Sequence, residues 1–292
     1  MAKIKEIRNR IKSVRATHKI TSTMEMVATG RMKRAMDRMV EARPFMNGFT
    51  EIMGALVAGG DLPDHPLLEQ RSEVRREAVL VLSSNRGLCG AFNTNLYRRC
   101  REEIGRIRGE GREPEIHTLG KKVTGLLRFQ GEAIHQAAEL PDRPVFADAV
   151  GLAERLAARF TGPEEDRVDR VTIIFARYES ALRQPPESRQ VLPVRPVTPD
   201  TEGRRGGDAT LYSPDRAEIF AALLPVYVES VILQALLETT CSEQVARRNA
   251  MKNATENAED MIKTLTRNLN KVRQAQITRE LAEIVGGSQG LQ

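Results

Sequence analysis

The sequence has no tryptophan, and aromatic residues make up only 4% of its 292 residues. It has only three cysteines, Cys89, Cys100 and Cys241, and none of them forms a CxxC pair. This usage indicates a reducing compartment and fits neither a disulfide framework nor a zinc site. The four histidines are scattered, so the sequence predicts no metal cluster. They are His18, His65, His117 and His135.

Long apolar runs are also absent. No stretch of about 18 consecutive apolar residues occurs, so no transmembrane helix is predicted. The opening residues, MAKIKEIRNR, lack the apolar centre of a secretory signal, and Glu6 argues against a transit peptide.

Helix-breaking residues are missing from both ends of the chain. Residues 226–285 contain no Gly or Pro, and residues 2–43 contain only Gly30. At 1.5 Å per residue these segments would form helices of about 90 and 60 Å. Two such helices can pair antiparallel into a rod, which is a poor pocket for small-molecule chemistry.

The apolar spacing of both segments is typical of a coiled coil. A 3-4-3 spacing relates Ile4, Ile7, Ile11 and Val14, and its strict continuation would place His18, Thr21 and Glu25 on the seam. We expect the seam to shift instead to the apolar residues nearby, with a locally overwound stretch. These residues are Ile20, Met24 and Val27.

In the last segment the expected seam keeps a 3-4 alternation and then takes an extra four-residue step to Leu269. The seam residues expected in the last helix are Met251, Ala254, Ala258, Met261 and Leu265.

The first helix is expected to end near Ala42, because Pro44 disfavours helical geometry in the residue before it, although the pattern can resume to Val57.

Between these segments, short apolar runs alternate with helical patterns, which predicts a small α/β domain with a partly parallel sheet. Strands are expected at 78–83, 115–119, 168–178 and, as an edge strand with Pro193 and Pro196, 190–197. Helices are expected at 94–107, 121–129 and 145–160, and a Gly-rich turn at 201–208.

The predicted fold class is therefore α/β, with two long terminal helices forming an antiparallel coiled coil and a central Rossmann-like domain. The expected division is 1–58 for the N-terminal coiled-coil helix, 75–200 for the central α/β domain and 209–286 for the C-terminal coiled-coil helix.

Positive charge is concentrated in the first helix. Residues 1–43 hold twelve Lys and Arg against four Asp and Glu, whereas the rest of the chain has no excess of basic residues. This pattern fits a solvated face or a surface for an acidic partner.

The loop 85–91 lies where phosphate-binding loops occur, but it matches neither a GxGxxG nor a Walker motif, so a tight turn is favoured.

Three segments carry a family resemblance. Residues 20–28 (ITSTMEMVA), 83–93 (SSNRGLCGAFN) and 242–285, which include SEQVAR and NKVRQAQITRELAEIV, resemble the gamma subunit of bacterial F-type ATP synthases. They occur in the family's order and span nearly the whole chain. Asn85, Arg248, Arg267 and Leu269 depart from the usual pattern.

The resemblance implies a non-catalytic rotor shaft that couples ion flow through the membrane ring to conformational changes at the catalytic beta subunits. The implied partners are the alpha, beta and epsilon subunits and the c-ring, on the cytoplasmic side of the bacterial inner membrane, with no cofactor, no metal and no nucleic acid. Met24, Arg247, Arg273, Gln274 and Thr278 would contact beta. Residues implied to contact the ring or epsilon are Arg31, Lys33, Arg34 and Tyr212.

Two other classes of protein remain compatible with the residues alone. The basic first helix could bind nucleic acid, which predicts salt-dependent binding. An α/β enzyme could use the loop at Gly87 and Gly90, in which case residues 75–200 would bind a nucleotide. Neither the coupling ion nor the ring stoichiometry can be read from the sequence.

Overall fold

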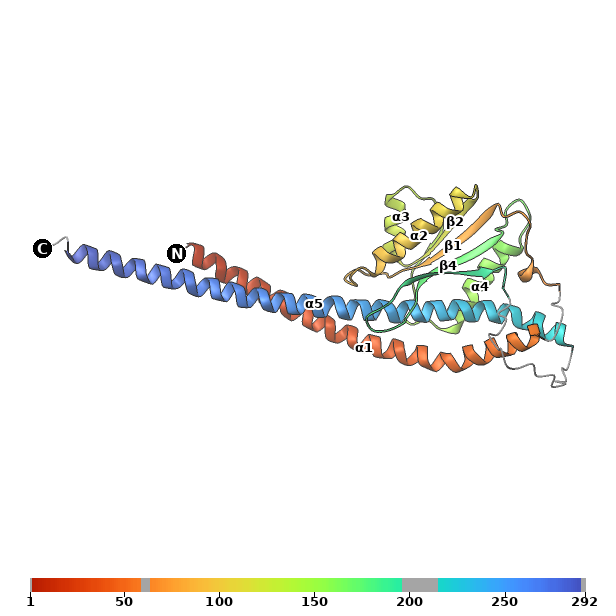
Figure 1. Cartoon of the computed structure of the whole chain (residues 1–292), viewed down its shortest axis with the longest axis horizontal. Coiled ribbons are helices and arrows are strands. Elements are labelled where there is room, and N and C mark those ends of the chain that lie inside the picture. Colours follow the sequence, from red (N-terminus) through yellow and green to blue (C-terminus); the bar gives the residue numbers. More distant parts are fainter. Residues whose placement is uncertain (1, 59–63, 196–214, 290–292) are drawn as a thin grey trace. The chain divides into compact units, whose positions relative to one another are not determined.

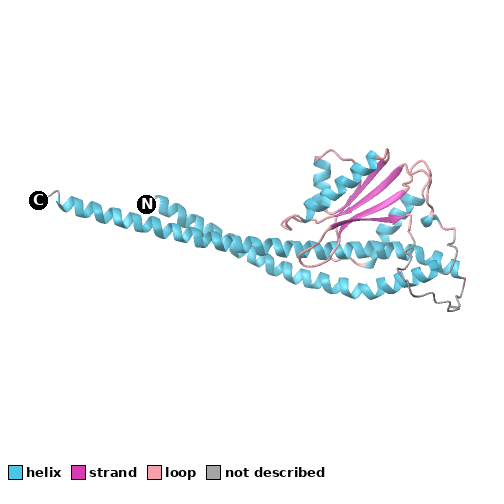
Figure 2. Cartoon of the chain, viewed as in Figure 1, coloured by secondary structure: helices cyan, strands magenta, loops and turns pink. Residues whose placement is uncertain are grey.

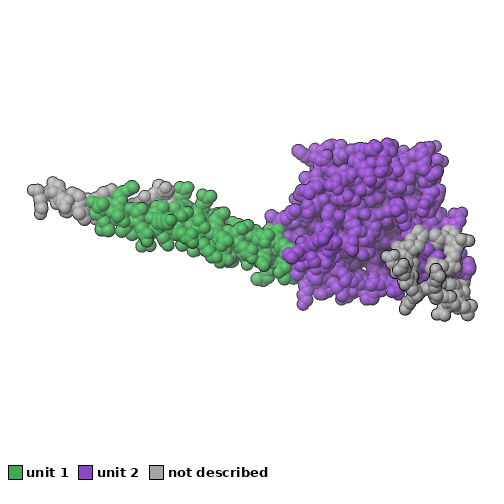
Figure 3. Space-filling view, viewed as in Figure 1, with its two compact units in different colours: residues 1–30, 247–292 green, residues 31–246 purple. Residues whose placement is uncertain are grey.

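The computed structural model describes residues 2–58, 64–195 and 215–289. Helix α1 (Ala2–Ala58) and helix α5 (Arg216–Gln289) are the two longest elements (Figure 1). The chain divides into two units, residues 1–30 with 247–292 and residues 31–246 (Figure 3). We call them the helical unit and the α/β unit.

The α/β unit contains one five-stranded sheet in the order β3-β2-β1-β4-β5. Strands β1 to β4 are parallel, and β5 pairs antiparallel with β4 at one edge. The strands are β1 (Arg76–Leu82), β2 (Glu113–Leu119), β3 (Ile134–Ala138), β4 (Arg170–Ala176) and β5 (Pro186–Leu192).

Helices cover both faces of this sheet (Figure 2). On one face lie α2 (Phe92–Gly109) and α3 (Lys121–Phe129), packed on the side chains of Val79, Val81 and Ile116. On the other lie α4 (Phe146–Thr161) and the parts of α1 and α5 that belong to this unit. A short 3-10 helix, η1 (Pro66–Leu68), precedes β1.

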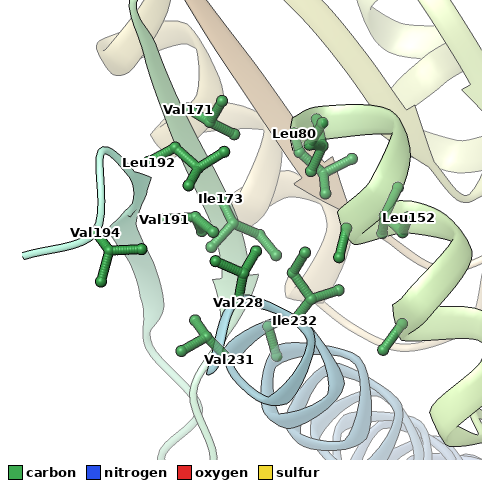
Figure 4. Close-up of a cluster of buried hydrophobic side chains, with 14 of the residues drawn as sticks. Leu80, Leu152, Val171, Ile173, Val191, Leu192, Val194, Val228, Val231 and Ile232 are labelled. Carbon is green, nitrogen blue, oxygen red and sulfur yellow. The ribbon is translucent and has the colours of Figure 1, made fainter. Parts of the chain in front are cut away.

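The larger core forms on the α4 and α5 face. Ile173 of β4 lies next to Val228 of α5 (Figure 4), and Leu80, Val171 and Ile232 belong to the same cluster. All five side chains are almost completely buried. Burial of each large apolar side chain contributes about 1.5–3 kcal/mol, so this contact fixes α5 on the sheet. The mixed α/β fold with long terminal helices is confirmed.

Helix α1 continues through Pro44, and the prediction that it ends near Ala42 is wrong. Proline removes one helical hydrogen bond, here to the carbonyl of Val40. Val40 is exposed, so water can reach that carbonyl. Met39 before the proline and Phe49 after it are both buried in the α/β unit. Packing on both sides of Pro44 therefore outweighs the local propensity.

Helix α5 contains one stretch that is long and apolar enough to cross a membrane by length and composition, although the sequence has no run of about 18 consecutive apolar residues. Half of that stretch is buried inside the protein. Phe220, Leu224 and Leu236 belong to the core on the sheet. The hydrophobicity of α5 is thus accounted for by packing, and core helices commonly pass the same test.

The sheet differs from the predicted strands at its edges. Strand β3 was not predicted, because its exposed sequence IHQAA has little apolar pattern. The edge strand near Pro193 was expected at 190–197 but spans Pro186–Leu192. It ends before Pro193 because that residue has no N–H for the ladder. The predicted turn at 201–208 lies outside the described residues.

Candidate subunit-contact surface

Burial along α1 follows strict heptad spacing within the helical unit, and the predicted shift of the seam is wrong. Steps of three and four residues continue through the polar positions, because a helix pair buries a side chain every 3.5 residues on average. Apart from the half-buried Ser22, which flanks the seam, the buried and half-buried residues are Ile4, Ile7, Ile11, Val14, His18, Thr21, Glu25 and Ala28.

A hydrogen bond across the helix pair makes this polar seam possible. Thr255 Oγ1 of α5 donates to Thr21 Oγ1 of α1 at 2.9 Å, and Thr21 Oγ1 donates to the carbonyl of His18 at 3.1 Å. Buried hydroxyls need such partners. Ala28 and Ala258 are also buried, and their small side chains let the helices approach closely.

The apolar residues displaced from the seam form an exposed stripe. Ile20, Met24 and Val27 are 55%, 40% and 51% exposed, and their i, i+4, i+7 spacing places them on one side of α1. We call these three residues the α1 stripe. Aliphatic side chains exposed in a row typically mark a contact surface. Sequence reasoning placed Ile20 and Val27 in the seam and so missed this surface.

The α5 half of the pair is equally regular. Steps of four and three residues carry the seam through Ile262, so the predicted seam position of Met261, which is 48% exposed, is wrong. When the seam passes through Thr255 rather than Ala254, the alternating spacing of three and four residues reaches Leu269 without the additional four-residue step that the sequence predicted. The seam residues are Met251, Thr255, Ala258, Ile262, Leu265, Leu269 and Val272, and the half-buried Gln276 continues the same spacing.

The last described turns of α5 have no α1 residue opposite them. If Thr255 lies opposite Thr21 in an antiparallel pair, Arg273 lies opposite residue 3. Figure 1 accordingly shows the C-terminal end of α5 extending past the N-terminal end of α1. Here Ile277 and Leu281 are exposed although apolar, and Gln276 donates to Glu280 at 2.8 Å. We call residues 273–282 the α5 tip.

The residues implied to contact beta fall into two regions. Arg273, Gln274 and Thr278 are exposed on the α5 tip. Met24 lies on the α1 stripe, and Arg247, half-buried, lies near it along the pair. Twenty-six residues separate Arg273 from Arg247, a rise of about 39 Å. The structure therefore does not gather these residues into one site.

The residues implied to contact the ring or epsilon lie elsewhere. Arg31, Lys33 and Arg34 are exposed on the part of α1 that belongs to the α/β unit. Tyr212 lies outside the described residues.

At the end of β4, near the switch point where Rossmann-like sheets bind nucleotides, the strand is packed against a helix, and a hollow of about 730 Å³ beside it is lined by Tyr178, Arg189 and Glu238 among others. Helix α5 occupies this place. Ser242 Oγ donates to the carbonyl of Ala176 at 3.2 Å, and the backbone N–H of Tyr178 donates to Glu238 Oε2 at 3.1 Å. Neither the strand end nor α5 is left available for a ligand at these contacts.

The loop after β1 uses its polar side chains internally. Asn93 Oδ1 accepts from the backbone N–H of Ser84 at 3.1 Å. Asn85 Nδ2 donates to the carbonyl of Leu140 at 2.7 Å, and its Oδ1 accepts from the Leu140 N–H. Leu88 adopts a positive φ of 64°. These contacts are those of a tight turn that anchors neighbouring loops.

The cysteines are free and buried. Burial raises the pKa of Cys100 and of Cys241 to about 12. Both thiols are therefore protonated at neutral pH, and neither can act as a nucleophile, which requires the thiolate.

A coiled-coil helix pair joined in one chain to a Rossmann-like unit whose sheet is packed against one of those helices defines a class of subunit that works through its surfaces. A protein-family model described as ATP synthase matches residues 3–291 of this chain. An ATP synthase gamma chain of Gemmatimonas aurantiaca is 44% identical over the full length of both chains. That of Frankia casuarinae is 41% identical over 99% of this chain and 97% of its own.

Solved structures show the same fold at lower sequence identity. A chain of the Euglena gracilis mitochondrial ATP synthase OSCP/F1/c-ring structure aligns with a TM-score of 0.67 at 21% identity, covering 99% of this chain and 95% of that one. A chain of the Tetrahymena thermophila mitochondrial ATP synthase central stalk and c-ring gives 0.56 at 22% identity, covering 80% and 99%.

The chain belongs to the ATP synthase gamma-chain family. It is a non-catalytic subunit and forms the central stalk rotor of a membrane-associated complex, as the resemblance implied.

Proposed function

We propose that this chain couples ion flow to ATP synthesis by turning the helical unit against the alpha and beta subunits, while the α/β unit meets epsilon and the c-ring. The complex would lie on the cytoplasmic side of the bacterial inner membrane. The observation that carries this proposal is the α1 stripe, an apolar surface that the helix pair itself leaves exposed.

The stripe supports differential contact with a surrounding partner. Helix α1 presents Ile20, Met24 and Val27 on one side only, so the helical unit is chemically asymmetric around its axis. A partner that surrounds it would meet a row of three exposed apolar side chains in one orientation and no such row on the opposite side of α1. A contact of unequal strength shifts the populations of the partner's conformations, and this shift is the coupling.

The α5 tip would supply directional bonds. Arg273, Gln274 and Thr278 offer one guanidinium, one amide and one hydroxyl on an exposed helix. Each bond to a charged group of beta would contribute about 1.5–3 kcal/mol. Arg247 would pair with acidic residues of beta nearer the α1 stripe.

The contact of α1 with the c-ring and epsilon is proposed from the charge of α1. Arg31, Lys33 and Arg34 are cations close together on α1, and polar ring loops and epsilon would meet them. Tyr212 would belong to the same contact.

The test is Met24→Lys in the assembled complex. Met24 is exposed, so the substitution leaves the helix pair intact, but a Lys in an apolar contact must be desolvated. We expect fewer protons pumped per ATP hydrolysed, measured as acidification of inverted vesicles at matched hydrolysis rates.

Met26→Lys is the matched control. Met26 is also exposed, and its position two residues away places it on the opposite side of α1. It should pump protons nearly as well as the unaltered complex. Unchanged pumping in Met24→Lys, or equal loss in both variants, would contradict the assignment of the contact to the α1 stripe.

A further inference from the structure

Three potential metal ligands come together on one side of the sheet. His117 Nε2 lies 2.8 Å from Glu115 Oε1, and His135 Nε2 lies 3.9 Å from the same oxygen. The two imidazole rings are 5.0 Å apart between centroids. The ligand atoms of all three residues lie within 4.8 Å of one another. The expectation that the histidines are scattered is therefore wrong for these two.

The strand geometry explains this arrangement. Glu115 and His117 are two residues apart on β2, so their side chains lie on the same face of the sheet. His135 lies on the neighbouring edge strand β3, in an irregularity where Ile116 pairs with Ile134 but His117 pairs with Gln136. Bulges of this kind re-aim a side chain. The spacing gives no motif, so a local sequence search cannot find this cluster.

Ion pairs hold the carboxylate of the cluster in place. Arg159 of α4 binds both oxygens of Glu115, and its other nitrogen donates to Asp166 Oδ2 at 2.8 Å.

We propose that Glu115, His117 and His135 bind a divalent transition metal of the zinc class. Two imidazoles and a carboxylate are the donor set of many Zn²⁺ sites with one open position. Zn–N and Zn–O bonds of about 2.0–2.2 Å place tetrahedral ligand atoms about 3.3 Å apart. The separations of 2.8 and 3.9 Å bracket this value, and the half-exposed His135 has room to rotate.

The proposed ion would tie the edge strand to the rest of the sheet. Strand β3 pairs only with β2, and most of its residues are exposed. Glu115 is already held to α4 by Arg159, so a metal would link β3, β2 and α4 at one point. Its role is structural, and it is independent of the contacts proposed for the helical unit.

The test uses the full chain, freed of any affinity tag and treated with a chelator. Calorimetric titration with ZnCl₂ should give one bound ion per chain, and Co²⁺ should give the visible absorption of a four-coordinate site with nitrogen ligands. His135→Gln should weaken Zn²⁺ binding by at least about tenfold, the lower end of the effect measured even for outer ligands. Because His135 is exposed, this variant keeps the fold.

His18→Gln is the control, since His18 is not one of the three proposed ligands and belongs to the helical unit, so this variant should leave the affinity unchanged. His117→Gln should abolish binding, but its side chain is buried, so the fold of that variant is checked by circular dichroism. The proposal is overturned if the unaltered chain binds no Zn²⁺, or if it and His135→Gln bind with the same affinity.

Discussion

At the scale of single residues, Asp169 shows how one buried carboxylate organises the start of two strands. Its oxygens accept from the backbone N–H groups of Arg75 and Arg76 at 2.8 and 3.0 Å, and from Arg71 Nη1 at 3.0 Å. Burial raises the pKa of Asp169, but these bonds outweigh it and lower the pKa below its usual range. The bonds therefore stabilise the ionised form in the folded state.

Asp169→Asn should destabilise the chain at neutral pH and make its stability less sensitive to acid. A folded-state pKa below the unfolded value adds stability above about pH 3.9, which is lost as the pH falls through the folded pKa. Losing a charged hydrogen bond costs about 1.5–3 kcal/mol. Urea unfolding between pH 7 and pH 2.5 measures both effects.

Asp166→Asn is the comparison for that experiment. Asp166 is exposed, and surface ion pairs contribute about 0–1 kcal/mol. A loss as large as that of Asp169→Asn would show that burial is not the cause.

The sequence predicted some of the candidate site residues and missed others, and the difference has a physical cause. Gln274 and Thr278 attract notice because polar side chains cluster there, and both are exposed. The partners expected for them are other chains, so their roles stay predictions. The cluster of His117 and His135 depends on which strands are neighbours, and β3 has too little pattern to be recognised.

At the scale of elements, the hydrogen bond between Thr21 and Thr255 fixes the register of α1 against α5. A one-step slip would separate the buried Thr21 hydroxyl from the half-buried Thr255 hydroxyl and leave each with only a carbonyl of its own helix as partner. Removing one partner of a buried hydrogen bond costs more than replacing both by apolar groups.

Thr21→Val should therefore cost about 1 kcal/mol, and Thr21→Val with Thr255→Val should recover most of that loss. Urea unfolding followed by helical circular dichroism gives the coupling energy of this double-mutant cycle. Thr17→Val is the control, because Thr17 is exposed and bonds only within its helix. Additive losses in the double variant would mean that the hydroxyls are not energetically coupled.

The elements that the sequence predicted well are those with strong local patterns. The run around Leu80 is a central strand, and the helix at 121–129 has the predicted bounds. Where local and long-range preferences conflict, the sequence misleads. Pro44 stays helical because Met39 and Phe49 are buried on either side, and the seam follows the geometry of pairing rather than the most apolar residues.

At the scale of the whole molecule, the two units differ in what holds them together. Strands β1 and β4 are covered on both faces, whereas the α5 tip has neither a core nor an α1 residue opposite it. Hydrogen exchange reports such differences in local stability.

In the free chain, amides near residues 2–20 and 265–285 should exchange quickly, while those of 78–82 and 171–175 stay protected. In the assembled complex, the helix ends should become protected as well. Mass-spectrometric hydrogen exchange on both samples measures this. Equal protection of the α5 tip and of β1 in the free chain would show that the tip is stable without partners.

The position of α5 on the sheet also determines when the molecule can finish folding during synthesis. The core on that face needs Phe49 from α1 and Leu224 to Leu236 from α5, with the whole sheet lying between them in the chain. The ribosome delivers β1 to β5 well before these last residues emerge. Since contacts so distant in sequence form late, the nascent sheet keeps an apolar face uncovered. This interval is when the growing chain most needs a chaperone.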